Sequence, residues 1–467
     1  MKLIMKFGGT SVQNAEATRQ AVDIIVSHLE KGDQMAVVVS AQRGVTDKII
    51  EAAEQMVSSR DTTAVTTLVE FLTTAHLTTL QGVAPDYYTE TSEIIIRRIE
   101  TLHDFLHAVF HLRELTQRSR DYVISFGERL NAPVISAALR QRGISSLVLD
   151  GCEAGILTTG NHGDAIALPA GEPRIRARLE PLMSQSVPVV MGFMGCTEKG
   201  VVTTLGRSGS DYSAAILGAA LMVDEIWIWT DVDGIMTTDP RLVKDARVIP
   251  RISYIEVMEL SFFGAKVMHS RSIEPAMQKN IPVWVKNTFN PSYPGTCIEK
   301  GERRESRVVK AITFIDKVAA ITITGAQMIG RPGVAKHIFT ILADHQINVM
   351  MISQGSSEAN ISLIIESQQV GTAMEALQPL RERCVFREIT ANENISAVAV
   401  VGSGMAGMAG TAGRTFGALG KAGINVMMIS QGSSEVNISF VVSRDDGPRA
   451  VTVLHDEFAL STHCEEC

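Results

Sequence analysis

Three short stretches carry glycines and charged residues that could form a ligand-binding site. In the first, MKFGGTS, Lys6 stands just before the pair Gly8 and Gly9. Glycines let the backbone approach a ligand closely, and free amides at a helix start attract anions. Because Lys6 adds a full positive charge, the stretch predicts a phosphate site. The alternative interpretation of the same residues is a tight turn beside an exposed lysine. The stretch is not a P-loop, because the glycine and lysine spacing of that motif is absent.

The second stretch, TTLGRSGSD, runs from Thr203 to Asp211. Gly206 and Gly209 make a flexible loop, and Asp211 lies where the N-cap of a following helix belongs. A helix cap alone explains Asp211. Arg207 beside it, however, would lie at the same sheet edge as the first stretch.

The third stretch, WTDVDGIMTTDPR, follows the apolar run EIWIWT. Loops at the carboxyl ends of parallel strands are where open α/β sheets bind ligands. Charged side chains crowd this loop, namely Asp231, Asp233, Asp239 and Arg241. We therefore expect the loop to contribute to the same binding site.

Alternating strand and helix patterns must position these loops. Short apolar runs such as LIMKF, MAVVVS and PVVMGF are typical of buried parallel strands, and helical patterns cover about 15–29 and 47–58. The order predicts an α/β protein, a three-layer sandwich on a mostly parallel sheet. Residues from about 64 to 140 are expected to be mainly helical, as an insertion or cap. The charged run EKGERRESR (299–307) is the expected end of this catalytic half.

A duplicated unit follows. INVMMISQGSSE occurs at 347–358 and again at 424–435. Each copy has an apolar strand, a Gly-rich loop, an amphipathic helix, two further strands, a second helix and a short final strand. This order, βαββαβ, predicts two ferredoxin-like domains. The expected domains are therefore 1–300 for the catalytic part, 311–391 for the first copy and 392–467 for the second.

The second copy also contains a glycine pattern that is typical of a different kind of binding site. Gly402, Gly404 and Gly407 fit the G-x-G-x-x-G fingerprint of dinucleotide-binding domains. In the first copy Gln327 replaces the second glycine, and too little chain follows Gly407 for a doubly wound domain. Dinucleotide binding is thus the weaker interpretation.

Composition limits the other classes of function. The 467 residues suggest about three domains, and a net charge of −8 argues against a nucleic-acid surface. No apolar run approaches the ~20 residues of a membrane span, and no signal peptide is evident, so we expect a cytoplasmic protein. The six cysteines are scattered, and we expect reduced thiols without a role.

Five motifs in this order identify a family. KFGGTS, SFGERL, GRSGSD, WTDVDGIMTTDPR and GAKVMH resemble those of the aspartokinases, and the duplicated unit resembles their paired ACT regulatory domains. The resemblance implies transfer of phosphate from Mg²⁺-bound ATP to the side-chain carboxylate of L-aspartate. It also implies the roles of individual residues.

The expected catalytic residues are Lys6, Asp211 and Lys266. The nucleotide is expected to contact Lys6, Phe7, Gly8, Gly9, Thr230, Asp231, Met236, Arg241, Lys266 and Val267. Aspartate is expected to contact Ser40, Thr46, Glu128, Arg207 and Ser210, with Glu128 accepting the α-ammonium. No residue is expected to be a dedicated metal ligand.

Three positions depart from the family pattern. Ser208 replaces a glycine, and Met236 replaces a tyrosine near the nucleotide. Ser270 replaces a proline in the loop after GAKVMH. Ser208 must accept the backbone angles of the glycine that it replaces. None of the three removes a charged catalytic group.

The duplicated unit is expected to sense an amino acid. The resemblance implies that Asn348, Gln354, Asn425 and Gln431 contact the effector, with L-threonine the first choice and L-lysine the second. The alternative is that one copy serves only contacts between chains. We expect a homodimer or a dimer of dimers through the ACT domains. The alternatives are a kinase for another amino acid and a sensor without activity, which would lack Lys6 or Asp211.

Overall fold

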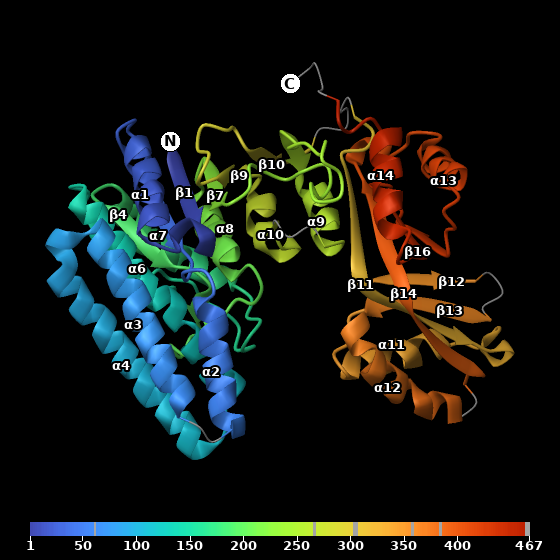
Figure 1. Cartoon of the computed structure of the whole chain (residues 1–467), viewed down its shortest axis with the longest axis horizontal. Helices are drawn as coiled ribbons and strands as arrows, with labels where there is room; N and C mark the ends of the chain where they lie inside the picture. Colours follow the sequence, from blue (N-terminus) through green and yellow to red (C-terminus); the bar gives the residue numbers. More distant parts are fainter. Residues whose placement is uncertain (60–61, 265–267, 302–306, 356–358, 383–384, 463–467) are drawn as a thin grey trace. The chain divides into compact units, whose positions relative to one another are not determined.

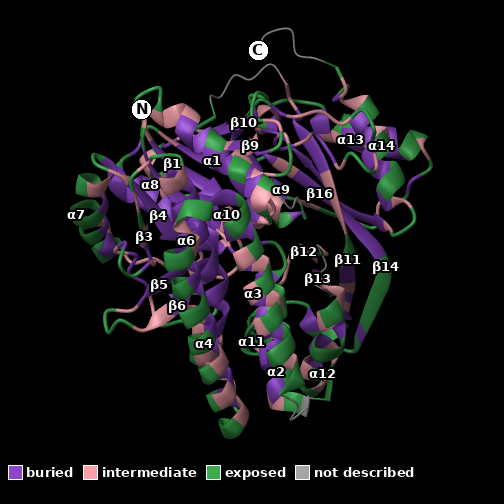
Figure 2. Cartoon of the chain, turned by 60° about the vertical axis from the view of Figure 1, so that its left-hand side comes forward, coloured by how far each residue is buried: buried purple, intermediate pink, exposed green. Residues whose placement is uncertain are grey.

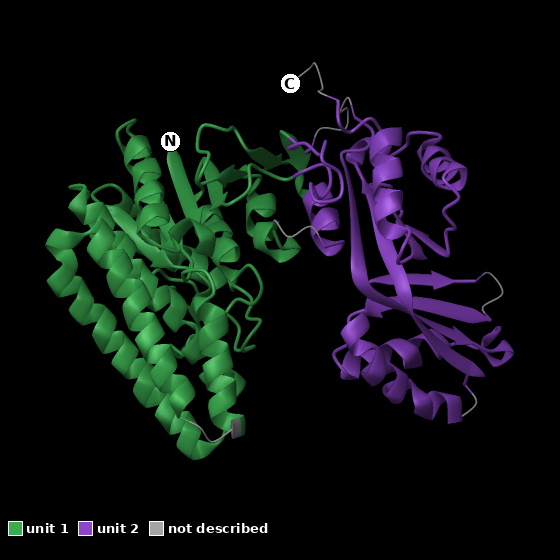
Figure 3. Ribbon diagram, in the orientation of Figure 1, with its two compact units in different colours: residues 1–235, 250–254, 267–300 green, residues 236–249, 255–266, 301–467 purple. Residues whose placement is uncertain are grey.

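The computed structural model describes residues 1–59, 62–264, 268–301, 307–355, 359–382 and 385–462. The chain divides into two compact units, coloured separately in Figure 3. The first comprises residues 1–235, 250–254 and 267–300, and the second comprises residues 236–249, 255–266 and 301–467. Each unit has its own sheet.

The first unit is built on an eight-stranded sheet of order β3-β4-β2-β1-β7-β9-β10-β8 (Figure 1). Neighbours from β3 to β9 are parallel, and β10 runs antiparallel to β9. The strands are β1 (Lys2–Phe7), β2 (Gln34–Val39), β3 (Ser146–Leu149), β4 (Val187–Met191), β7 (Glu225–Thr230), β8 (Arg251–Ser253), β9 (Val283–Asn287) and β10 (Thr296–Glu299). The central strands are buried on both faces, as their continuous apolar sequences require (Figure 2).

Helices cover this sheet, and a hairpin completes the unit. The helices are α1 (Ala15–Leu29), α2 (Val45–Ser59), α3 (Thr63–Val83), α4 (Tyr88–Leu112), α5 (Gln117–Ile124), α6 (Phe126–Gln141), α7 (Glu172–Met183), α8 (Gly209–Leu221) and α10 (Ser270–Lys279). The hairpin is β5 (Met194–Cys196) and β6 (Val202–Thr204). The α/β sandwich and the helical stretch from about 64 to 140 are both confirmed.

The second unit contains a six-stranded antiparallel sheet of order β12-β13-β11-β14-β16-β15. Its strands are β11 (Ala311–Thr324), β12 (Met351–Gln354), β13 (Asn360–Glu366), β14 (Glu388–Val401), β15 (Met428–Gln431) and β16 (Asn437–Ser443). Its helices are α11 (Val334–Asp344), α12 (Val370–Glu382), α13 (Thr411–Lys421), α14 (Gly447–Glu457) and most of α9 (Tyr254–Phe262).

The two copies of the repeat share the long strands β11 and β14. The second half of β11 pairs with β13, whereas residues 311–315 pair with 397–401 of β14, which belong to the second copy. The strand beside β14 of the second copy therefore comes from residues 311–315, at the start of the first copy. The two ferredoxin-like units are thus interleaved in one sheet, and the boundary near 392 stays a prediction from the sequence.

The cysteine prediction is wrong for two residues. Cys152 and Cys196 form a disulfide, with their Cα atoms 5.2 Å apart. They are 44 residues apart in the chain, so no local pattern marked them as partners. Cys297 is a buried free thiol, and Cys384, Cys464 and Cys467 lie outside the described residues. In the part of the chain that is described, no helix is long and apolar enough to cross a membrane.

Candidate active site

A cavity of about 970 Å³ lies in the first unit, at the carboxyl ends of β1 and β2. Eight residues expected to act on substrates line it: Lys6, Gly9, Ser40, Thr46, Glu128, Arg207, Ser210 and Asp211. The fold thus brings together all the residues expected to bind aspartate and part of the expected nucleotide site.

Lys6 and Asp211 form a buried ion pair at one side of this cavity. The Lys6 Nζ atom lies 2.5 Å from Asp211 Oδ1, and only 10% and 8% of the two side chains are exposed. Lys6 belongs to β1, and Asp211 lies in the first turn of α8. The N-cap prediction for Asp211 is wrong, because α8 begins at Gly209 and its cap is Ser208. The Asp211 carboxylate is therefore free to orient the lysine.

The glycine pair permits a close approach of three segments. A Cβ atom at Gly9 would come within 2.9 Å of the Ala41 carbonyl oxygen, closer than real Cβ contacts. The Gly8 amide donates to the Trp229 carbonyl at 3.0 Å, which ties the loop to the end of β7. A short 3-10 helix, Gly9–Val12, follows directly. A Cβ atom at Gly8 would come within 3.5 Å of Lys6 Nζ, so the glycine loop lies beside the lysine.

Glu128 is a buried carboxylate with one free oxygen. It is 4% exposed in the first turn of α6, and its Oε1 atom accepts from the Ala41 amide at 3.1 Å. Among the described residues, Oε2 has no hydrogen-bond partner. Burial raises the pKa of Glu128 to about 8, against the opposing effects of the Ala41 amide and the Lys6 charge. Such a group is suited to a cationic ligand, which would supply the missing partner.

Arg207 is the candidate for a substrate carboxylate. It is exposed at the cavity, and no hydrogen bond or ion pair of its side chain is found within the described residues. The preceding Gly206 has φ +74°, and the following Ser208 has φ 52°. Ser208 therefore adopts the left-handed conformation expected of the family's glycine. Both bends present the arginine at the mouth of the loop.

The three hydroxyl residues occupy the walls. Ser40 follows β2, and its amide donates to the Phe7 carbonyl at 3.2 Å. Thr46 lies in the first turn of α2, and a Cβ atom at Gly127 would come within 3.2 Å of its Oγ1 atom. Ser210 lies in the first turn of α8 and is 8% exposed. All three residues fit the predicted aspartate pocket.

The nucleotide residues are only partly gathered in this unit. Thr230 ends β7, beside the glycine loop, and its hydroxyl donates to Asp231 at 3.2 Å. Met236 and Arg241 belong to the second unit, where Arg241 forms an ion pair with Asp239. Lys266 and Val267 lie outside the described residues.

The structure adds residues that sequence reasoning did not select. Asp121 of α5 and Phe193 line the cavity, and Phe193 has the unusual φ of 69°. Asp233, already named in the third sequence stretch, accepts from Asn287 at 2.8 Å and from Asn290 at 3.1 Å, which fixes the loop after β7. Asp121 lies four residues before Ser125, where SFGERL begins, but nothing in that spacing shows that its side chain points to the cavity.

The predicted effector residues all belong to the second unit. Gln354 lines a cavity of about 320 Å³ together with Arg331 and Gly333. Asn348, Asn425 and Gln431 are exposed. In the second copy, the Gly407 amide donates to the Glu435 carboxylate at 2.6 Å. One amide of that loop is therefore already occupied.

Comparisons with known proteins agree with this geometry. A model of the amino acid kinase family matches residues 1–287, and a model of the ACT domain matches residues 321–379 and 398–458. Aspartokinase 1 (chloroplastic) of Arabidopsis thaliana is 33% identical, covering 99% of this chain and 81% of the relative. The chain belongs to the aspartokinase branch of the amino acid kinase family. It is therefore a kinase whose phosphate acceptor is a carboxyl group.

Other aspartokinases are similarly close. Aspartokinase 3 (chloroplastic) of A. thaliana is 35% identical over 99% of this chain and 82% of its own length. Escherichia coli aspartokinase III in complex with aspartate and ADP (R-state) has a TM-score of 0.83 at 28% identity, covering 98% of this chain and 99% of that one. The same enzyme in complex with lysine and aspartate (T-state) has a TM-score of 0.80 at 29% identity over the same shares.

Proposed function

We propose that this aspartokinase transfers the γ-phosphoryl group of Mg²⁺-bound ATP to the side-chain carboxylate of L-aspartate. The product would be 4-phospho-L-aspartate, which leads to lysine, threonine and methionine. The observation that carries the proposal is one cavity that holds the Lys6–Asp211 pair, Glu128 with a free buried oxygen, and Arg207 without a partner in the described part of the chain. These groups match a phosphate, an ammonium and a carboxylate.

The acceptor needs no general base. A free aspartate side chain has a pKa near ~3.9, so it is ionised at neutral pH and is already a nucleophile. The protein must then position two anions and neutralise the charge between them. In the proposal, Lys6 neutralises the transferring phosphoryl group while Asp211 holds the ammonium of Lys6 in place. Arg207 binds the α-carboxylate of the substrate as a bidentate pair.

Glu128 would hold the α-ammonium of aspartate. With its pKa raised to about 8, Glu128 is mostly protonated at neutral pH when no ligand is present. A bound ammonium favours the ionised form, so binding releases a proton from Glu128. The energetic gain is large only for a ligand whose ammonium reaches Oε2. This requirement selects amino acids over simple dicarboxylates.

Magnesium fits this site without a protein cage. Across the described ranges, no group of three or more acidic, histidine or cysteine side chains could hold a metal ion. Mg²⁺ in kinases keeps several waters and is bound mainly by substrate phosphates, so Asp211 would suffice to hold one of those waters. The ion would add positive charge between the phosphate oxygens.

The first experiment follows ADP release from Mg²⁺-ATP with L-aspartate, with L-glutamate and without an acceptor. Aspartate-dependent release is expected, with little release for glutamate, whose extra methylene misplaces the carboxylate. Glu128→Gln removes the charge and keeps the shape, and we expect it to lower kcat/KM for aspartate about 10²-fold. Glu30→Gln, at an exposed helix end, is the matched control and should match the wild type.

Two outcomes would contradict the proposal. Equal release with and without aspartate, from folded protein, would leave an ATP-hydrolysing or sensing protein. Equal activity of Glu128→Gln and Glu30→Gln would remove Glu128 from the aspartate site.

We further propose that an amino acid from the same biosynthetic route inhibits the enzyme through the ACT pair. L-threonine is the first choice, because the Gln-Gly-Ser-Ser-Glu loop resembles that of threonine-sensitive relatives. L-lysine is the second, and lysine is the ligand of the E. coli T-state complex. The cavity beside Gln354 supports an effector site in the first copy.

A further inference from the structure

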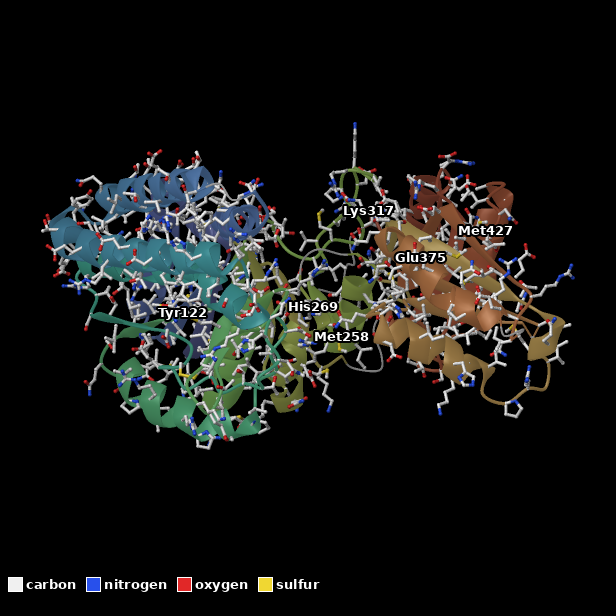
Figure 4. All side chains as sticks on the ribbon, turned by 90° about the horizontal axis from the view of Figure 1, so that it is seen from below. Tyr122, Met258, His269, Lys317, Glu375 and Met427 are labelled. Carbon is white, nitrogen blue, oxygen red and sulfur yellow. A yellow bond between two sulfur atoms is a disulfide. The ribbon has the colours of Figure 1, made fainter. Side chains whose placement is uncertain are left out.

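Asp121 is a fully buried acid in the wall of the aspartate cavity. It belongs to α5, its side chain has no exposed area, and the proposed chemistry does not use it. Its neighbour Tyr122, labelled in Figure 4, packs against Phe105 and Phe126 and so holds α5 against α4 and α6. A buried carboxylate is costly unless strong donors surround it.

Donors from two distant segments meet the Asp121 carboxylate. Oδ2 lies 2.7 Å from His162 Nδ1, and the Gly163 amide donates to Oδ1 at 2.9 Å. The Thr204 hydroxyl donates to Oδ1 at 2.5 Å, across 83 residues of sequence. One side chain of α5 thus joins the 162–163 loop to the end of β6.

The joined segments lead directly to Arg207. Thr204 is the last residue of β6, and the chain then passes through Leu205 and Gly206 to the arginine. A Cβ atom at Gly206 would come within 2.7 Å of Asp164 Oδ1, so the loop packs closely against this bend. Asp164 in turn forms an ion pair with Arg271. Asp164 directly follows Gly163, whose amide donates to Asp121. The segment that Asp121 binds therefore also packs against the bend before Arg207.

We propose that Asp121 is a positioning residue that sets the affinity for aspartate through the Thr204 hydroxyl and the backbone leading to Arg207. The inference rests on the proposed role of Arg207. In this role the carboxylate acts through the Thr204 hydroxyl and not directly on the substrate. Its role is to keep the end of β6 in one place, so that the Arg207 guanidinium meets the substrate carboxylate without further ordering.

The test compares two neighbouring threonines of β6. Thr204→Val keeps the shape and removes the donor to Asp121. Thr203→Val removes an equally buried hydroxyl from the same strand, but its partner is Thr158 at 2.5 Å. We expect Thr204→Val to raise the KM for aspartate about tenfold, as for a small misplacement of a binding group. The KM for ATP and kcat should change less than twofold, and Thr203→Val should leave the aspartate KM unchanged.

Two further variants separate positioning from simple stability. Thr204→Ser restores the donor and should recover the aspartate KM. Asp121→Ala, which removes the acceptor, should raise the aspartate KM at least as much as Thr204→Val. Adding Thr204→Val to Asp121→Ala should cause no further increase, because both changes break the same contact.

Equal increases in aspartate KM for Thr203→Val and Thr204→Val would overturn the inference, because loss of any buried hydroxyl would then have the same effect. An unchanged KM in folded Asp121→Ala would also overturn it. Failure of the proposed function would give different results. Wild-type protein would then show no aspartate-dependent ADP release, or Arg207→Ala would leave the aspartate KM unchanged.

Discussion

Single residues of this site could be predicted where binding a charged ligand requires a particular type of side chain. Lys6 was selected because phosphate recognition needs positive charge near flexible glycines, whereas the roles of Arg207 and Asp211 followed from the resemblance to aspartokinases. Their partners were less accessible to sequence reasoning. The free oxygen of Glu128 depends on the Ala41 amide, 87 residues away, and on burial that no motif encodes. The environment of Glu128 consequently gives the sharpest prediction at this scale.

The affinity for aspartate should depend on pH through Glu128. Because the ammonium of aspartate binds the ionised form and the pKa of free Glu128 is about 8, the aspartate KM should fall up to about tenfold per unit as pH rises from 6 to 7. It should level off above pH 8. Steady-state kinetics at saturating ATP will measure this dependence, and Glu128→Gln should remove it between pH 6 and 8.

The same raised pKa has a consequence without ligand. The folded protein keeps a proton on Glu128 that the unfolded chain loses above its ordinary pKa of 4.5. The unfolded state therefore binds fewer protons between pH 4.5 and 8, and the contribution of Glu128 to stability falls as pH rises through that window. Urea unfolding of Glu128→Gln should lack this contribution. An identical pH dependence of stability in both proteins would contradict the assigned pKa.

At the scale of elements, sequence periodicity located helices and strands well but placed one helix start incorrectly. Helix α1 occupies the expected residues, whereas α8 begins before Asp211. An aspartate near a helix start resembles an N-cap in any sequence pattern. In this structure Asp211 forms an ion pair with Lys6 instead. The N-cap residue is Ser208, which has a left-handed conformation and makes no side-chain hydrogen bond to the helix.

Replacing Ser208 with glycine should stabilise the protein. A non-glycine residue in the left-handed region costs about 1 kcal/mol, and glycine avoids most of that cost. We expect Ser208→Gly to raise the free energy of unfolding by roughly 0.5–1 kcal/mol, measured by urea titration. Ser27→Gly, inside helix α1, is the opposite control and should lower stability by a similar amount. A loss of stability in Ser208→Gly would show that the serine hydroxyl makes a compensating contact.

For the whole molecule, the two copies of the repeat are alike in sequence but not in their loops. Gln354 borders a cavity, whereas in the second copy Glu435 already accepts from the Gly407 amide. Shared strands β11 and β14 place both copies in one sheet. The cytoplasmic location and the assembly into dimers remain predictions.

Gln354→Ala should weaken feedback inhibition more than Gln431→Ala does. We expect at least a tenfold increase in the threonine concentration for half inhibition, about 1.4 kcal/mol of lost binding, with kcat unchanged. Dose–response curves with threonine and with lysine, supported by calorimetric binding, will distinguish the two effectors. Equal effects of both substitutions would indicate two equivalent sites, and inhibition by lysine alone would reverse the order of effectors proposed above.

The sequence by itself determined the duplicated units, the alternating strands and helices, and the glycine loops at strand ends. These features are local, because periodicity and backbone freedom are properties of neighbouring residues. Only the tertiary structure decided which distant groups meet: Lys6 with Asp211, Asp121 with Thr204, and Cys152 with Cys196. Such contacts depend on the packing of elements far apart in the chain, and burial then sets the charge state of Glu128.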